Sequence, residues 1–272
     1  MAFMIVGIGL LILCGVLLLF RRSQDGRLFQ IRTAESCSAQ GLSDAAGYVA
    51  ERLGEAGSFS RIAQVNGVVK CDSPLTSEVA RQPCVYYEMS VVREYEEVRL
   101  KVRRRNRLKV RGARRSSERV ATNSQRVPFC LEDATGRILV NPDHAEMDLV
   151  KTVERFEPSP NGGLDDLLPR GFGLDVEKHA RGVVSGSRTL GYRFTERLLP
   201  VDQRVHVVGE ARDASGQLAM ERPREKGKKL IVSLKSQEEL IASAESALRW
   251  LLVGAAASGI SGAGLVVAGL MR

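Results

Sequence analysis

The sequence predicts a mainly β, antiparallel α+β domain flanked by two transmembrane helices. Two uncharged blocks, residues 2–20 and 250–271, lie near the ends of the 272-residue chain. Between them, alternating and β-branched stretches separated by turn-forming residues are typical of antiparallel strands. Charged residues make up 26% and hydrophobic residues 44% of the chain, and these values argue against wholesale disorder and against a fibrous protein.

Each uncharged block matches the ~20 apolar residues that cross a hydrocarbon core about 30 Å thick. The first block is rich in Leu, Ile and Val, and the second is diluted by Gly, Ala and Ser. A cleaved signal peptide has basic residues before its apolar run and a small-residue site after it. Here Arg21 and Arg22 follow the run, so we favour a retained helix. We expect an integral, multi-pass membrane protein with two spans.

The basic residues around the first span predict its orientation. Arg21, Arg22, Arg27 and Arg32 follow the span, and no basic side chain precedes it. The positive-inside rule therefore places the central region in the cytoplasm, with the plasma membrane as the location in a bacterium. The second span has one arginine on each side and adds no information.

Three parts are expected between the N-terminal span and the C-terminus. Residues 38–54 carry apolar residues at helical spacing and predict a juxtamembrane helix. A β-rich domain is expected over residues 60–235, interrupted but not divided by a Pro- and Gly-rich loop at 158–173. Residues 236–239 have the form of a capping box, so a helical stalk over residues 237–271 continues into the second span at about 250.

Several stretches within residues 60–235 have strand patterns. Two hairpins are expected around turn-forming residues, one over 127–140 and one over 205–221. Further strands are expected at residues 62–69, 84–95, 98–102 and 229–234.

One segment, residues 99–119, dominates the charge of the chain. It contains nine Arg and two Lys against Glu118 alone, so its net charge of +10 exceeds the +8 of the whole chain. Three readings are open: a solvated hairpin tip, contact with anionic lipid at about 1 kcal/mol per basic residue, or nucleic acid. Nucleic acid is disfavoured because the segment has no aromatic residue to stack on bases. The candidate lipid-contact residues are Arg99, Lys101, Arg103, Arg104, Arg105, Arg107, Lys109, Arg111, Arg114 and Arg115.

The sequence offers no pattern for a catalytic, cofactor or metal site. None of the five cysteines forms a C-x-x-C pair, so we expect thiols packed as small apolar groups, or a disulfide if the domain faces an oxidising compartment. The histidines lie far apart and are expected at ordinary surface or core positions. The acidic pairs 132–133 and 165–166 lie in turns, where carboxylates accept from backbone N–H groups. The cysteines are Cys14, Cys37, Cys71, Cys84 and Cys130, and the histidines are His144, His179 and His206.

Small residues recur every four positions in the second span. Gly254, Ser258 and Gly262 form one such row, which lets helices approach closely. The row predicts packing against the first span or against a second copy of the chain, a possible homo-oligomer, or marks only a weakly hydrophobic span.

An ordered set of short motifs between Gly67 and Leu240 resembles the GIDE domain. The motifs are PLTS at 74–77, PCVYYE at 83–88, VPF at 127–129, LEDATGRILVNP at 131–142, GYRFTERLLPV at 191–201, VVGEA at 207–211 and IVS at 231–233. This domain lies next to the membrane in ubiquitin ligases of mitochondria and the chloroplast envelope, and in bacterial proteins. The resemblance implies a span, a GIDE domain and a second span.

The resemblance implies a protein- or lipid-binding and sensing role for the domain. The ligases of the family add a zinc-binding RING after the second span, and in them the GIDE domain faces the intermembrane space. In this sequence only Arg272 follows Met271 and no Cys/His array occurs elsewhere, so we expect no RING. The alternative function is a ubiquitin ligase, as the family suggests. The protein partner is not specified by the sequence.

Overall fold

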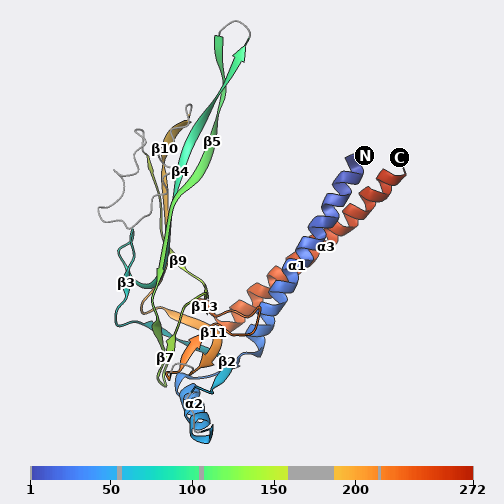
Figure 1. Cartoon of the computed structure of the whole chain (residues 1–272). Coiled ribbons are helices and arrows are strands. Elements are labelled where there is room, and N and C mark those ends of the chain that lie inside the picture. Colours follow the sequence, from blue (N-terminus) through green and yellow to red (C-terminus); the bar gives the residue numbers. More distant parts are fainter. Residues whose placement is uncertain (1, 54–56, 104–106, 159–186, 214–215, 272) are drawn as a thin grey trace. The chain divides into compact units, whose positions relative to one another are not determined.

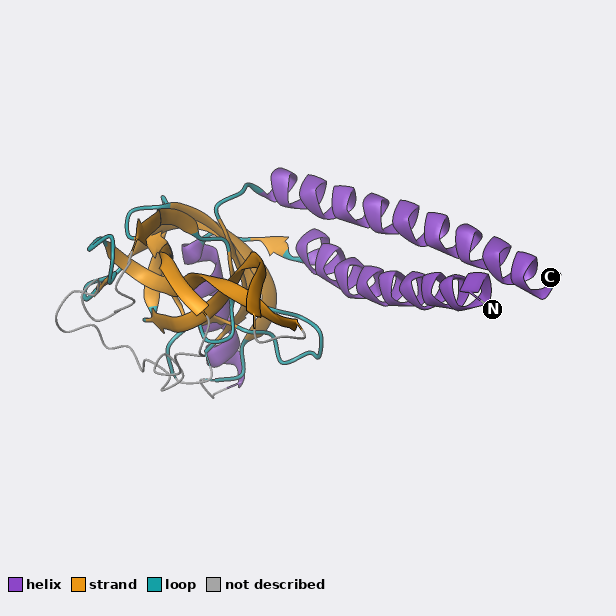
Figure 2. Cartoon of the chain, turned by 90° about the horizontal axis from the view of Figure 1, so that it is seen from above, coloured by secondary structure: helices purple, strands orange, loops and turns teal. Residues whose placement is uncertain are grey.

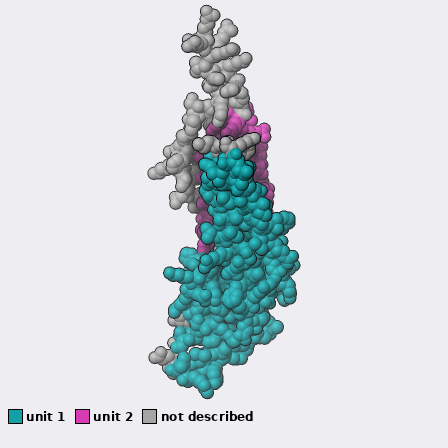
Figure 3. All heavy atoms as spheres, turned by 90° about the vertical axis from the view of Figure 1, so that its right-hand side faces the viewer, with its two compact units in different colours: residues 1–70, 130–148, 204–272 teal, residues 71–129, 149–203 magenta. Residues whose placement is uncertain are grey.

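The computed structural model describes residues 2–53, 57–103, 107–158, 187–213 and 216–271 (Figure 1). These residues form two compact units, each with its own sheet (Figure 3). Unit 1 comprises residues 1–70, 130–148 and 204–272, and unit 2 comprises 71–129 and 149–203. The strands expected in one β-rich domain are therefore shared between two units, because the chain passes between them repeatedly.

Two long helices of unit 1 lie side by side. Helix α1 spans Ala2–Thr33 and helix α3 spans Gln237–Leu270; both termini of the chain lie at the far end of this antiparallel pair (Figure 2). The capping box at the start of α3 is confirmed, because the Ser236 side chain accepts from the N–H of Glu239 and the Glu239 side chain accepts from the N–H of Ser236. Helix α1 continues 13 residues past the predicted span, which ends at residue 20.

Glycine lets the two helices approach closely. A Cβ on Gly7 of α1 would lie 2.8 Å from the carbonyl oxygen of Gly262 and 2.7 Å from Val266 Cγ2. A Cβ on Gly262 would lie 3.0 Å from the carbonyl oxygen of Gly7. Ser258 is buried and donates to the carbonyl oxygen of Gly254. The small-residue row thus lies against α1 of the same chain, and its use by a second copy stays a prediction.

The eight-stranded sheet of unit 1 closes on itself. Its order is β1-β2-β6-β7-β12-β11-β13-β8, with an additional pairing between β2 and β11. The pairings β2-β6-β7-β12-β11 therefore form a closed circuit, as in a small barrel. The pairs β1–β2, β7–β12 and β8–β13 are parallel. The strands are β1 (Glu35–Ser36), β2 (Ser60–Lys70), β6 (Phe129–Glu132), β7 (Arg137–Val140), β8 (Glu146–Met147), β11 (Arg204–Arg212), β12 (Ala219–Glu221) and β13 (Ile231–Ser233).

Two polar side chains form hydrogen bonds that connect helices α1 and α2 to segments next to the strands of this sheet. Gln30 of α1 is 1% exposed; its amide donates to the carbonyl oxygen of Lys229 at 2.6 Å and accepts from the Lys229 N–H at 3.1 Å. Asp133, in the turn between β6 and β7, accepts from the N–H of Ala39 at 2.7 Å, the first residue of helix α2 (Ala39–Leu53). Helix α2 matches the predicted helix at 38–54 to within one residue at each end.

The five-stranded sheet of unit 2 is organised around one long strand. Strand β4 (Pro83–Arg103) pairs with β5 (Arg107–Arg126) on one side and β10 (Ser187–Pro200) on the other. Strand β9 (Val150–Pro158) adds to β10, and the short β3 (Leu75–Thr76) adds to the start of β4. Among the described residues, β4 pairs with β10 as far as Glu97 and with β5 as far as Arg103.

One face of this sheet is apolar. Met89, Val91, Ala121 and Phe194 form a buried cluster with Val120 and Tyr192 on this face. Glu196, on the same face of β10, is fully buried and accepts from the N–H groups of Val79 and Ala80, each at 2.8 Å. These bonds compensate the burial of a charged group and fix the segment that precedes β4.

Candidate functional site

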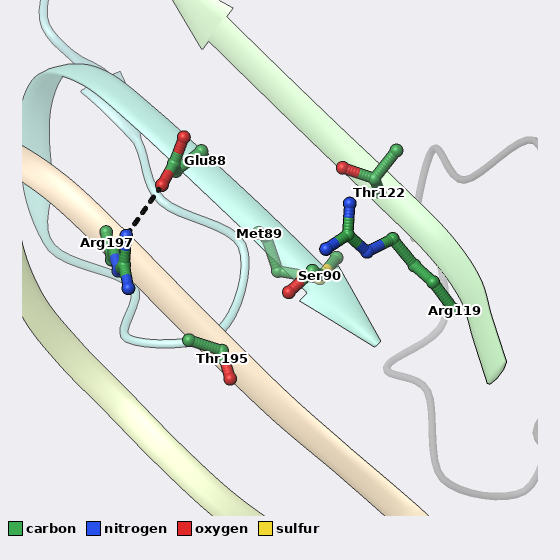
Figure 4. A pocket seen from close by; sticks show the side chains of 7 residues that line it. All are labelled: Glu88, Met89, Ser90, Arg119, Thr122, Thr195 and Arg197. Atoms are coloured by element: carbon green, nitrogen blue, oxygen red, sulfur yellow. Dashed lines mark ion pairs between the residues drawn. The ribbon is translucent and has the colours of Figure 1, made fainter. Parts of the chain in front are cut away.

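A polar groove lies on the opposite face of the unit 2 sheet. It is a cavity of about 410 Å³ built from three adjacent strands, β4, β5 and β10 (Figure 4). Its volume falls within the ~300–1,000 Å³ typical of ligand sites. The lining residues are Glu88, Met89, Ser90, Arg119, Thr122, Thr195 and Arg197. We call this site the sheet groove.

Three hydroxyl residues form the floor of the sheet groove. Ser90 of β4 pairs with Thr122 of β5 and with Thr195 of β10, so the three occupy one row across the sheet. Cross-strand partners share a face of a sheet. Because the side chains of Ser and Thr are shorter than those of the residues on either side, the row leaves a groove between them.

Charged side chains flank the hydroxyl row. Glu88 and Arg197 occupy paired positions on β4 and β10, and their charged groups lie 3.5 Å apart. The guanidinium group of Arg119 extends from β5 toward Ser90 (Figure 4). Among the described residues, no carboxylate forms an ion pair with Arg119, whereas Arg193 of β10 pairs with Glu94 at 2.7 Å. Among the described residues, Arg119 is therefore the guanidinium group of the sheet groove that has no carboxylate partner and can bind an anion.

A β-bulge explains why Arg119 faces the sheet groove. Val91 pairs with Ala121 but Val92 pairs with Arg119, so Val120 is the extra residue in β5. Val120 and Ala121 are both in the apolar cluster. The extra residue moves Arg119 to the polar face, in keeping with the tendency of bulges to redirect side chains at functional sites.

The predicted lipid-contact residues lie on the β4–β5 hairpin. Arg114 and Arg115 pair with Glu97 and Glu96, which also pair with β10. The others lie further along the hairpin, apart from Arg104 and Arg105, which lie outside the described residues. Arg115 pairs with Glu96 at 3.5 Å and its side chain is 80% exposed. The register also pairs Lys101 with Lys109 and Arg103 with Arg107. Lipid contact by these residues stays a prediction.

None of the five cysteines forms a disulfide. Burial, followed by the charge of Glu196, raises the pKa of Cys84 to about 11. Burial, followed by the charge of Glu78, raises the pKa of Tyr87 to about 12. A thiol must ionise to act as a nucleophile, so Cys84 is an inert core residue. Among the described residues, no group of three His, Cys, Asp or Glu lies close enough to hold a metal ion.

The described histidines lie at one buried and one exposed position, and the described acidic pair lies at a turn. His206 is buried, with Nδ1 2.5 Å from Asn66 Oδ1, and burial lowers its pKa. His144 is exposed. Asp133 organises a turn, whereas His179 and the pair 165–166 lie outside the described residues.

Comparison with known families identifies this combination of sheets and helices. Residues 99–268 match the model of the GIDE family, described as E3 ubiquitin ligase. The chain belongs to the GIDE family. The match covers well over half of the chain, and it includes β5, β10 and all but the last two residues of α3. Arg119, Thr122 and Thr195 of the sheet groove lie inside it, and Glu88 and Ser90 precede it.

A curated relative supports the assignment to the GIDE family. E3 ubiquitin-protein ligase SPL1 of Arabidopsis thaliana is 30% identical over 110 residues, which are 40% of this chain and 30% of that protein. The aligned region is thus about a third of the length of the relative. No solved structure matches the chain significantly.

Sequence reasoning missed the sheet groove. Its hydroxyl row is built from residues about 30 and 70 positions apart in the chain, and only the strand register brings them together. Arg119 was included in the basic segment but not among the candidate contact residues. The alternation of apolar and polar residues in 87–91 predicts a strand with one polar face, and this pattern was the signal available in the sequence.

Proposed function

We propose that this GIDE-family protein is an integral membrane protein that acts as a protein- or lipid-binding and sensing module at the bilayer. The α1–α3 pair would serve as its anchor. The two sheets would present binding surfaces next to the membrane.

The register of α1 against α3 carries the membrane proposal. Gly7 lies against Gly262 and Val266, Met4 against Gly269, and Cys14 against Gly259. The uncharged residues 2–20 are therefore aligned with the uncharged residues 250–271, and both stretches end at about the same level. Nineteen residues at 1.5 Å per residue span about 28 Å, which is close to the thickness of a hydrocarbon core.

The surface of the aligned region supports the same proposal. Large apolar side chains point outward on both helices, among them Ile12 at 63%, Leu19 at 70%, Ile260 at 76% and Leu270 at 71% exposure. Both helices are long and apolar enough to cross a membrane. An exposed apolar surface of this extent is rare on a soluble monomer and marks contact with a partner or a membrane.

Arginine and tryptophan mark one boundary of this apolar region. Arg21 and Arg22 follow the first uncharged stretch, and Arg249 precedes the second. Trp250, the first residue of the second stretch, is 73% exposed. Trp is enriched at membrane interfaces, and basic residues concentrate on the cytoplasmic side. We therefore place the sheets on the cytoplasmic side. Contact of the basic hairpin with anionic lipid would add a second attachment there.

Membrane fractionation combined with proteolysis tests the anchor and its orientation. The full chain should stay in the pellet after alkaline carbonate washing of membranes. Protease should digest the sheets in inverted vesicles but spare them in right-side-out vesicles. Extraction by carbonate would contradict the anchor, and digestion only in right-side-out vesicles would reverse the orientation.

Ubiquitin ligase activity is the second candidate function. It is favoured by the description of the family and by the likeness to the Arabidopsis ligase SPL1. Purified chain would be incubated with ubiquitin, activating enzyme and a panel of conjugating enzymes, with and without an added RING protein. Ubiquitin chains formed without the RING protein would favour the ligase over the binding module.

A further inference from the structure

We propose that the sheet groove binds a carboxylate side chain of an acidic, extended segment of a partner polypeptide, and that Arg119 is the residue that binds it. The proposal rests on the binding role proposed above and specifies the chemistry of the partner. It is carried by the charge, shape and position of the groove on the sheet of unit 2.

Within the described part of the groove, Arg119 is the cation available to a ligand. The neighbouring guanidinium group of Arg197 lies 3.5 Å from Glu88, and Arg193 lies 2.7 Å from Glu94. Among the residues that the structure describes, Arg119 forms no such pair. It reaches the polar face only because Val120 forms a bulge, and a bulge disrupts the hydrogen-bond ladder locally. An incoming anion would neutralise the charge that the bulge exposes.

The hydroxyl row complements a carboxylate. A guanidinium group binds a carboxylate with two parallel N–H···O bonds. The hydroxyl groups of Ser90, Thr122 and Thr195 both donate and accept hydrogen bonds. They can therefore donate to the remaining lone pairs of the carboxylate, or bond to the N–H and C=O groups of the segment that carries it.

The groove favours a carboxylate over a phosphate group. Phosphate sites commonly use free backbone N–H groups at a helix N-terminus or in a nest. Here the paired strands β4 and β10 use their backbone groups in ladder hydrogen bonds. Glu88 also lines the groove, and its charge opposes a dianion more strongly than a monoanion.

The groove favours a polypeptide over a free small molecule. Ligand sites usually bury 70–90% or more of a small ligand. Three adjacent strands of one sheet provide a floor but no roof among the described residues, and Arg119 and Thr122 are exposed. A side chain on an extended segment suits such an open site, because the segment brings its own surface to cover the groove.

Peptide titration of the full-length protein in detergent micelles tests the proposal. The probe is a dye-labelled hexaglutamate peptide with blocked ends, and the reference is the hexaglutamine peptide. Fluorescence anisotropy near physiological ionic strength should show binding of hexaglutamate only. Arg119→Gln should weaken that binding about tenfold or more, as expected for the loss of a charge-assisted contact.

Two further variants separate the groove from general attraction to a basic protein. Arg188→Gln removes the same charge from an exposed position of β10 outside the groove, and should change the affinity less than about twofold. Ser90→Val changes no charge but fills the hydroxyl row, and should weaken binding as Arg119→Gln does. Thermal unfolding of each variant verifies that it is folded, and these sheet-face substitutions should preserve the transition.

Three results would overturn the proposal. These are equal weakening by Arg188→Gln and Arg119→Gln, indifference to Ser90→Val, and displacement of hexaglutamate by inorganic phosphate at a lower concentration than by acetate. Each of these results can be distinguished from failure of the proposed membrane anchor, because the titration is done in micelles and does not require insertion into a membrane. Loss of carbonate resistance would leave the peptide affinity unchanged, and loss of peptide binding would leave the anchor unchanged.

Discussion

Asp133 joins the turn between β6 and β7 to the start of α2. Its Oδ1 accepts from the N–H groups of Thr135 and Gly136 at 2.7 and 2.9 Å, and its Oδ2 accepts from the N–H of Ala39 at 2.7 Å. One carboxylate therefore satisfies backbone donors in two separate segments. Donors left without partners at a helix start cost free energy.

Replacing Asp133 by Ala should lower the free energy of unfolding by about 2 kcal/mol, the upper range for loss of a helix cap. Thermal and denaturant unfolding of the purified chain in detergent, followed by circular dichroism, measures the change. The matched control is Glu132→Ala, which breaks an exposed ion pair with Arg137 and should cost less than about 1 kcal/mol. Equal effects of the two variants would contradict the role of Asp133.

The contribution of Asp133 should depend on pH. Burial alone would raise the pKa of Asp133, but hydrogen bonds from Thr135, Ala39 and Gly136 hold it below the ordinary value of 3.8. The stabilisation is therefore fully present above pH 3.8 and is lost as the pH falls through the folded-state pKa. The difference between the native chain and Asp133→Ala should be constant near neutral pH and shrink in acid.

Asp133 and Arg119 show which residue roles the sequence can predict. The role of Asp133 is local, because a carboxylate in a turn accepts from N–H groups two and three residues away. The position of Arg119 depends on a bulge, and hence on the register between β4 and β5. No single stretch of sequence contains that register, so Arg119 was grouped only with its charged neighbours.

At the scale of elements, the β4–β5 hairpin has an unusual charge pattern. Lys101 is paired with Lys109 and Arg103 with Arg107, and like charges at directly opposite positions destabilise a β-ribbon. An anionic surface would relieve this repulsion. The pattern gives a physical reason to test the hairpin for contact with anionic lipid.

Reversing Arg103, Arg104 and Arg105 to Glu should abolish most binding to anionic vesicles. The full chain in nanodiscs of neutral lipid would be sedimented with anionic or neutral vesicles, and the native chain should pellet only with anionic ones. Binding should fall with added salt, because exposed charges are screened beyond about 8 Å at physiological ionic strength. Equal pelleting with neutral vesicles, or indifference to the reversal, would leave the hairpin as a solvated tip.

The strands of unit 2 show where pattern reading is incomplete. Strand β10 was not predicted, although Tyr192, Phe194 and Leu198 alternate on its buried face. Glu196 breaks that alternation, because its burial depends on N–H groups from a segment more than 100 residues away. Strand β9 was not predicted either, because it is an edge strand without a buried residue.

At the scale of the whole chain, the question is whether α3 packs against α1 of the same chain or against a second copy. The small residues of α3 face α1 of the same chain, yet a row of small residues also suits contact with a second copy. Helix α3 begins at 237, as the sequence predicts, and ends at 270, one residue before the predicted end, because a capping box and an unbroken helical pattern are local signals. The choice of partner helix is not local, so it must be tested directly.

Cys14 offers that test, because a Cβ on Gly259 would lie 3.3 Å from its Sγ. In a Gly259→Cys variant, with the other cysteines replaced by Ser, mild oxidation of membranes should therefore link the two helices within one chain. On non-reducing gels the product should migrate as a monomer of altered mobility. Gly264→Cys is the control, because a Cβ at Gly264 has no heavy atom within 4 Å, and it should stay unlinked. A disulfide-linked dimer formed by Gly259→Cys would instead place the small-residue row at an interface between two copies.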